Sequence, residues 1–201
     1  MEKKFKPSFF PIFSQRENMF SIEGIDGAGK TTQAHALKKA LLLEGYKASY
    51  ATNPSNTDVG LFLRKNLNIL PSWQRISLFI LDIINILSLY ENSKEILIWD
   101  RYTHSTLTSN KDVLPSQIAP LLRFLPNPKI TFFLNIKPET ILKNRPSSIH
   151  DHSADLEWQK LKYARYIKIL KNNPSEFYVI DGTLSQKQIT KIMLNAILNK
   201  I

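Results

Sequence analysis

The sequence contains no cysteine, and this absence limits the chemistry open to the chain. Without thiols the protein can form neither disulfides nor thiolate metal sites, which fits a reducing compartment. The chain also lacks an apolar run close to the roughly 20 residues that span a bilayer, because polar residues interrupt the longest run, at residues 76–89. We therefore expect a cytoplasmic protein that does not cross a membrane.

Acidic residues and glycines are both few. The 17 Asp and Glu stand against 27 Lys and Arg, which leaves a formal net charge of +10. Such a positive field attracts nucleotides, nucleic acids and acidic surfaces alike, so charge alone does not choose the partner. The chain has 6 glycines, and those at positions 24, 27 and 29 stand close together.

The length and the apolar pattern predict an α/β fold. A chain of 201 residues can bury one sizeable core. Short runs rich in Ile, Val and aromatic residues alternate with longer helical stretches, which predicts a three-layer α/β/α arrangement with a five-stranded parallel sheet. The predicted strands are residues 19–24, 47–52, 96–99, 130–136 and 177–180. The predicted helices are residues 30–44, 57–66, 72–90, 115–124, 138–143, 156–171 and 185–199.

The domain organisation is expected to be simple. Residues 18–201 are predicted to form a single domain, preceded by an extension of unknown role at residues 1–17. The most polar and least periodic stretch inside the fold, RPSSIHDHSAD at residues 145–155, is predicted to be a mobile loop. His150 and His152 in this loop could bind a metal, but alternate residues on a loop without further ligands favour a solvated segment.

Residues 24–31 read GIDGAGKT and satisfy the pattern G-x-x-x-x-G-K-[ST] between a predicted strand and a predicted helix. In such a loop, backbone N–H groups converge on phosphate oxygens, Lys30 reaches the β and γ oxygens, and Thr31 offers its hydroxyl to Mg²⁺. A glycine-rich turn with an exposed lysine is the alternative, but the flanking elements favour phosphate binding. The pattern predicts ATP contacts at Gly24, Ile25, Asp26, Gly27, Ala28, Gly29, Lys30 and Thr31.

A second charged pair follows the predicted strand at residues 96–99. Asp100 ends this apolar run, where phosphate-loop proteins place an acid near Mg²⁺. Arg101 follows at once, and its guanidinium suits bidentate capture of a substrate phosphate. A turn or helix cap at Asp100 and a structural salt bridge at Arg101 are the competing interpretations.

Together these motifs resemble the thymidylate kinase family of nucleoside monophosphate kinases, from about residue 19 to the C-terminus. The resemblance is carried by FSIEGIDGAGKTTQ at residues 20–33, DRY at residues 100–102 and IDGTLS at residues 180–185. It implies a phosphate-loop kinase that transfers the γ-phosphoryl group of ATP to dTMP with Mg²⁺, giving dTDP for dTTP synthesis. It also implies a homodimer.

The resemblance further assigns roles to single residues. The residues with a catalytic role would be Asp26, Lys30, Arg101 and Arg145. Those that hold the metal would be Thr31 and Asp100. ATP would also meet Thr32. The resemblance makes residues 145–155 a lid, so ATP would meet Arg145 there, and it would meet Gly182 and Thr183 in the loop before the last helix. The acceptor nucleotide, whose ring would stack on an aromatic side chain, would contact Pro54, Arg64, Phe79, Arg101, Ser105 and Thr106.

The chain departs from the family pattern in several places. Thr52 and Asn53 stand where the family has arginine and glutamate, and Ile83 replaces the arginine that reads the base. The lid also lacks a second arginine. These departures leave open a kinase for another nucleoside monophosphate. The net charge of +10 leaves open a non-catalytic protein that binds nucleotides or nucleic acid. The lack of a recognisable nucleic-acid module in the sequence disfavours the latter.

Overall fold

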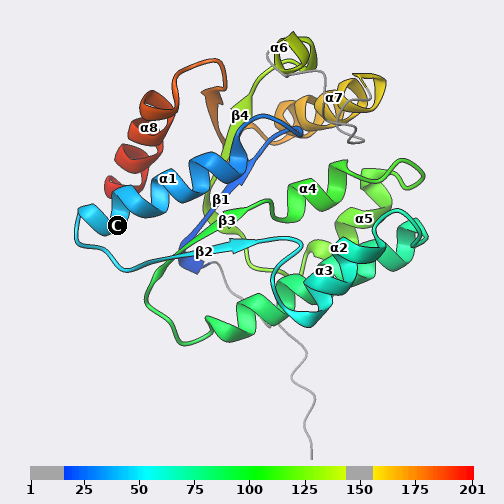
Figure 1. Ribbon diagram of the computed structural model, residues 1–201, viewed down its shortest axis with the longest axis horizontal. Coiled ribbons are helices and arrows are strands. Elements are labelled where there is room, and N and C mark those ends of the chain that lie inside the picture. The colour runs from blue at the N-terminus through cyan, green and yellow to red at the C-terminus, as the bar shows by residue number, and fades with distance from the viewer. Residues whose placement is uncertain (1–15, 144–155) are drawn as a thin grey trace, which may run out of the picture.

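The computed structural model describes residues 16–143 and 156–201 (Figure 1). Its centre is one sheet of five parallel strands in the order β2-β3-β1-β4-β5. The strands are β1 (Arg16–Glu23), β2 (Ala48–Thr52), β3 (Ile96–Asp100), β4 (Pro128–Asn135) and β5 (Phe177–Asp181). The α/β fold with a five-stranded parallel sheet is thus confirmed, and every predicted strand overlaps an observed one.

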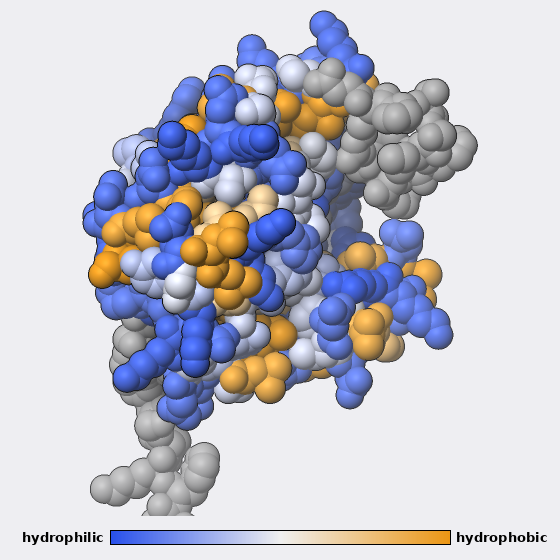
Figure 2. Space-filling view, turned by 60° about the vertical axis from the view of Figure 1, so that its left-hand side comes forward, coloured by the Kyte–Doolittle hydropathy of each residue, from blue (hydrophilic) through white to orange (hydrophobic). Residues whose placement is uncertain are grey.

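Helices cover both faces of the sheet (Figure 1). They are α1 (Lys30–Leu43), α2 (Asp58–Asn66), α3 (Ser72–Leu89), α4 (Thr103–Thr108), α5 (Pro115–Leu122), α6 (Pro138–Lys143), α7 (Leu156–Asn172) and α8 (Gln186–Leu198), with a 3₁₀ turn η2 (Pro174–Glu176). Figure 2 brings forward the side of the molecule on which α1 and α8 lie, where apolar patches alternate with hydrophilic residues.

The core is divided by the sheet into two apolar clusters, and the period of the strands explains the division. Along β1, Phe20 and Ile22 belong to one cluster while Met19 belongs to the other. Along β3, Ile98 joins the first cluster and Trp99 the second. Successive side chains of a strand point to opposite faces, so a continuous apolar run serves a strand that is buried on both sides. These two central strands therefore hold their carboxyl ends in fixed positions.

Helix α4 and the turn η2 were not predicted from the sequence. The residues of α4, THSTLT, have no strong helix former except Leu107. The helix begins where it does because the buried Glu23 carboxylate accepts hydrogen bonds from the backbone N–H groups of Tyr102, at 2.8 Å, and Ser105, at 3.3 Å. These are contacts from β1, distant in sequence, so local propensity does not reveal the helix.

Helix α3 is the one described helix that is long and apolar enough to cross a bilayer. Its residues Ile76, Ile83 and Leu87 are fully buried in the second cluster of the core, together with Trp99 of β3. Its Asp82 is also fully buried and hydrogen-bonded. Packing of this kind identifies α3 as a core helix of the fold, since length and composition alone do not separate core helices from spans.

Candidate active site

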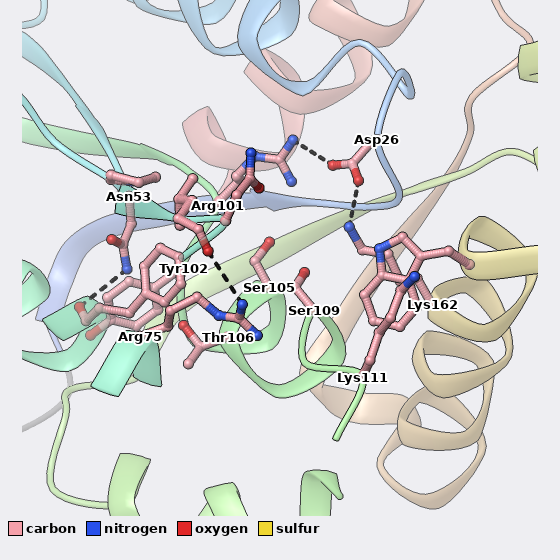
Figure 3. Close-up of a pocket in the computed structure, with 15 residues that line it drawn as sticks. Asp26, Asn53, Arg75, Arg101, Tyr102, Ser105, Thr106, Ser109, Lys111 and Lys162 are labelled. Carbon is pink, nitrogen blue, oxygen red and sulfur yellow. Dashed lines mark hydrogen bonds and ion pairs between the residues drawn. The ribbon is translucent and has the colours of Figure 1, made fainter. Parts of the chain in front are cut away.

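A pocket of about 600 Å³ opens beside the carboxyl ends of β1 and β3 (Figure 3). Ligands of open parallel sheets bind at this edge, because the loops that leave adjacent strands converge there. The lining residues come from the phosphate loop, the segment after β2, the helices α3, α4 and α7, and their connections. They are Asp26, Asn53, Pro54, Leu67, Asn68, Arg75, Phe79, Arg101, Tyr102, Ser105, Thr106, Ser109, Lys111, Trp158 and Lys162.

The phosphate loop follows β1 and ends at the N-terminus of α1. Gly24, Gly27 and Gly29 have φ values of 148°, 84° and 88°, in the region that favours glycine. A Cβ on Gly24 would also lie 3.0 Å from the carbonyl oxygen of Leu134. The glycines are therefore required by the shape of the loop, which leads its backbone into the positive end of α1, a setting suited to phosphate.

The side chain of Lys30 lies under this loop. Only 3% of the residue is exposed, and its Nζ donates a hydrogen bond to the Ile25 carbonyl at 2.6 Å. Burial, followed by repulsion from Arg101, lowers the pKa of Lys30 to about 7. An anion at the loop would favour the charged form of this lysine.

Thr31 and Asp100, the two residues predicted to hold a metal, are in contact. The Thr31 hydroxyl donates to Oδ2 of Asp100, and the Tyr50 hydroxyl donates to the same oxygen at 3.1 Å. The other carboxylate oxygen, Oδ1, is buried and has no hydrogen-bond partner among the described residues. A buried carboxylate oxygen without a donor fits a hard cation such as Mg²⁺.

The described residues contain no group of three or more His, Asp or Glu that could hold a metal alone. Mg²⁺ in phosphotransferases does not need such a group, because one or two protein oxygens, the substrate phosphates and waters together complete its coordination.

Arg101 has an unusual backbone. Its φ is 70°, the only positive φ of a non-glycine residue in the described part of the chain. Such a conformation costs free energy and persists where surrounding contacts enforce it, often at functional sites. The guanidinium donates to Asp26 Oδ1 at 2.8 Å, so the turn after β3 directs this cation at the phosphate loop.

Asp26 is held between cations from two parts of the chain. Figure 3 shows its carboxylate bonded to Arg101 on one side and to Lys162 of α7 on the other. Gln159 of α7 contacts Asp26 twice, by donation to Oδ2 at 3.1 Å and by acceptance from the backbone N–H at 3.2 Å. Burial alone would raise the pKa of Asp26, but the ion pairs with Lys162 and Arg101 outweigh it and hold that pKa well below its usual range.

Sequence reasoning assigned no role to Gln159 or Lys162. Together with Tyr166 they are buried at intervals of three and four residues along α7, the spacing of a helix face that packs inward. The sequence contained one signal for these two residues, which is that they are polar yet stand at the spacing of a buried helix face. A buried lysine needs a partner, so such a position indicates a contact with another charged segment. The partner of Lys162 here is the phosphate loop.

Most of the residues predicted to hold the acceptor lie together in the pocket: Pro54, Phe79, Arg101, Ser105 and Thr106. Ser105 also donates its hydroxyl hydrogen bond to the buried Glu23. Arg64 does not line the pocket. It is exposed, with its guanidinium on the Pro54 carbonyl at 2.6 Å and on Asn56 Oδ1 at 3.0 Å. It therefore braces the segment that carries Pro54.

Other predicted contacts lie away from this pocket or outside the described residues. Thr32 is exposed in the first turn of α1. Gly182 and Thr183 follow β5, where Gly182 donates to the Asn135 carbonyl at 3.0 Å and Thr183 contacts the Asp181 carboxylate. Arg145, the lid at residues 145–155 with its two histidines, and residues 1–15 lie outside the described residues.

The positions that depart from the family pattern have structural tasks. Asn53 donates from its side-chain amide to the Phe79 carbonyl at 3.3 Å, which ties the segment after β2 to α3. Ile83 is fully buried in the core. Thr52 ends β2 beside Asp100 in the sheet register.

Comparisons with known proteins point to the thymidylate kinase family. The family model described as "Thymidylate kinase" matches residues 22–192. A "Thymidylate kinase" of Thermoanaerobacter sp. (strain X514) is 31% identical over 197 residues, covering 88% of this chain and 95% of the relative. A "Thymidylate kinase" of Leptospira interrogans serogroup Icterohaemorrhagiae serovar copenhageni is 32% identical over 194 residues, with 89% and 93% covered. A "Probable thymidylate kinase" of Methanosphaera stadtmanae is 28% identical over 188 residues, with 82% and 94% covered.

Proposed function

Because the chain belongs to the thymidylate kinase family, and is an ATP-dependent phosphotransferase that acts on dTMP, we propose that the pocket beside the phosphate loop is its acceptor site. The observation that carries this proposal is the position of Arg101. Its strained backbone directs a guanidinium into a pocket that also contains an aromatic ring, Phe79, and that adjoins the loop expected to hold ATP.

On the donor side, the backbone of residues 24–31 holds the triphosphate and Lys30 neutralises its β and γ oxygens. Thr31 and Asp100 hold Mg²⁺. The Asp100 oxygen that has no hydrogen-bond partner within residues 16–143 and 156–201 supports this assignment. When bound, Mg²⁺ neutralises charge that develops on the transferring group. The family resemblance supports a role for Arg145, Gly182 and Thr183 in binding the donor nucleotide.

On the acceptor side, Arg101 binds the phosphate of dTMP and Phe79 stacks on the pyrimidine. An oxygen of that phosphate attacks the γ-phosphorus in line, a bond to that phosphorus forms, and the bond to the ADP oxygen breaks. Such a reaction needs little proton transfer from the protein, so positioning and charge neutralisation provide most of the rate. Lys162 adds a further cation beside Asp26, which supports a role for α7 in the same task.

Arg64 stays part of the proposal in a modified position. Its guanidinium donates to the carbonyl of Pro54, a lining residue of the pocket, so we propose that Arg64 supports the acceptor site from outside. We further propose that residues 18–201 act as one kinase domain in the cytoplasm, in keeping with the chain's lack of cysteine.

We also propose that the protein is a homodimer whose contact surface includes α2 and α3. A shallow apolar groove of about 440 Å³ lies between these helices, lined by Phe62, Leu70, Trp73, Gln74, Ser77 and Leu78. Phe62 and Trp73 are 50% and 47% exposed. A contiguous exposed apolar surface on a globular protein is typical of a contact site, and a second copy of the chain would cover it.

An assay of ADP formation with ATP, Mg²⁺ and a set of nucleoside monophosphates tests the acceptor and the site together. The wild type is expected to prefer dTMP, and Lys30→Met to lose nearly all turnover. Lys39→Met, an exposed lysine on the same helix, is the matched control and keeps full activity. Asp100→Asn should raise the Mg²⁺ concentration needed for half-maximal rate. Full turnover by the Lys30 variant, or an unchanged Mg²⁺ requirement, contradicts these assignments.

A further inference from the structure

The pocket contains an arginine that the sequence reasoning left without a role. Ile83, at the position expected to carry a base-reading arginine, is fully buried in the core and does not line the pocket. Arg75 does line it, from the same helix α3. The pocket is thus lined by an arginine from the same helix as Phe79, although Arg75 stands on another turn of that helix than Ile83.

Arg75 and Phe79 are four residues apart on α3, which places their side chains on one side of the helix, one turn apart. Both are half-buried. Figure 3 shows the Arg75 guanidinium extended into the pocket near Thr106, and Phe79 lines the same pocket. A planar ring stacked on Phe79 would therefore have its edge within reach of this cation.

The guanidinium is held in place before any ligand arrives. One nitrogen donates to the Ser72 hydroxyl at 2.8 Å and the other to the Leu67 carbonyl at 3.3 Å. A guanidinium has five N–H donors in a rigid fork and no acceptor. Two of these donors fix its position, and others can serve a ligand. A fixed donor loses little freedom when it binds, and this favours a role in recognition.

We propose that Arg75 selects the acceptor base by donating a hydrogen bond to the carbonyl oxygen at position 4 of a pyrimidine stacked on Phe79. The inference rests on the proposed acceptor site. Thymine and uracil present an oxygen acceptor at this position, whereas cytosine presents an amino donor. A guanidinium, which can only donate, pairs with the first two bases and opposes the third.

The nearest alternative is that Arg75 binds the acceptor phosphate. Arg101 and Lys162 are gathered around the Asp26 carboxylate of the phosphate loop. The contacts of Arg75 are instead with Ser72 and Leu67, at the start of α3 and the end of α2. This separation assigns Arg75 to the base end of the pocket. The two roles can be separated by measurement, because dTMP, dUMP and dCMP carry the same phosphate but different bases. An arginine that binds the phosphate affects all three nucleotides equally, whereas one that reads the base does not.

The test compares kcat/KM for dTMP, dUMP and dCMP in the wild type, Arg75→Met and Arg75→Lys. In Arg75→Met we expect kcat/KM to fall about tenfold or more for dTMP and for dUMP, and to stay the same or rise for dCMP. The ratio of dTMP to dUMP should not change, because both bases carry the same oxygen. Arg75→Lys keeps the charge without the planar fork, so its kcat/KM values should lie between those of the wild type and those of Arg75→Met.

Arg123→Met, an exposed arginine after α5, is the matched control and should leave all three values unchanged. Dissociation constants measured without ATP should follow the same pattern, and the melting temperature reports any loss of fold. An equal loss for all three nucleotides, or an unchanged ratio of dTMP to dCMP, overturns the inference. A wild type that binds no dTMP at this pocket would instead contradict the proposed acceptor site, so the two failures are distinguishable.

Discussion

At the scale of single residues, the site is built around the Asp26 carboxylate, which pairs with the cations Arg101 and Lys162. Lys162 is the least expected of them, since it comes from α7, far along the chain from the phosphate loop. Its side chain is 6% exposed, and its ammonium is bound to Asp26. A cation held in this way needs no reorganisation when negative charge develops nearby, which is the condition for effective electrostatic catalysis.

Replacement of Lys162 by methionine is therefore expected to lower kcat by about 10²-fold, the usual effect of removing one charge-stabilising group. The variant Lys162→Arg keeps the positive charge and should therefore lose less of kcat than the methionine variant. Lys160→Met provides the control, because Lys160 is exposed on the same helix and pairs only with Glu157 in the described part of the chain. Steady-state kinetics with saturating ATP and dTMP measure the effect. Equal rates for the Lys162 and Lys160 variants would show that Lys162 has no catalytic role.

A proton should be taken up when ATP binds. The pKa of Lys30 is lowered to about 7 from 10.5, so in the nucleotide-free protein at about pH 8.5 this lysine is mostly neutral. Triphosphate oxygens favour the charged form and raise the pKa, so close to one proton should be bound per ATP at about pH 8.5. Uptake should shrink as pH falls below 7, where Lys30 is already charged. Calorimetry in buffers of different ionisation enthalpy measures the proton count.

Lys30→Met is the control for this measurement, since it removes the titrating group. A wild type that takes up no proton at the alkaline pH would mean that the lysine is already charged without nucleotide.

The phosphate loop and its following residues could be predicted from the sequence because they are contiguous. The spacing of Gly24, Gly29, Lys30 and Thr31 encodes the loop directly, without reference to the rest of the chain. Arg75 and Lys162 were not found, because each belongs to the site only through the way its helix packs. A helix pattern predicts that a face is buried, but not which loop that face meets.

At the scale of elements, the segment after β2 is held to α3 by a buried carboxylate. Asp82 is fully buried and accepts from the Ser55 backbone N–H and the Thr57 hydroxyl, both at 2.7 Å. Thr57 caps α2, and Gly60 in its first turn approaches Ser55 so closely that a Cβ would lie 2.3 Å from the Ser55 carbonyl oxygen. These contacts position Pro54 and Asn53 at the pocket.

Asp82→Ala should cost about 3 kcal/mol of unfolding free energy, since buried donors would lose their acceptor. Asp82→Asn keeps one acceptor oxygen and should cost less. Urea unfolding at equal protein concentration measures both. A loss below about 1 kcal/mol for the alanine variant would mean that water replaces the carboxylate at little cost.

The elements themselves could largely be predicted, since strands and long helices follow the apolar period of the sequence. Helix α4 could not, because Glu23 determines its start through bonds across the sheet edge. The same helix carries Ser105 and Thr106 into the pocket. The acceptor side therefore depends on tertiary contacts to a greater degree than the donor side does.

At the scale of the whole molecule, the proposed dimer contact has a direct test. A double variant, Phe62→Glu and Trp73→Glu, places two carboxylates in the apolar groove between α2 and α3 and should convert the dimer to a monomer, since buried charge opposes association. Leu43→Glu, at an exposed position at the end of α1, is the control and should remain a dimer. Sedimentation velocity measures the mass. A wild type that sediments as a monomer, or a double variant that sediments as a dimer, contradicts the assignment.

We propose that one pocket and one loop, joined by Asp26, Arg101 and Lys162, hold the two nucleotides for phosphoryl transfer. A crystal structure with dTMP and a non-hydrolysable ATP analogue tests it most directly. We expect the triphosphate on the amides of residues 25–31, the monophosphate against Arg101 and the thymine ring on Phe79. A monophosphate bound outside this pocket, or a triphosphate away from the loop, would contradict it.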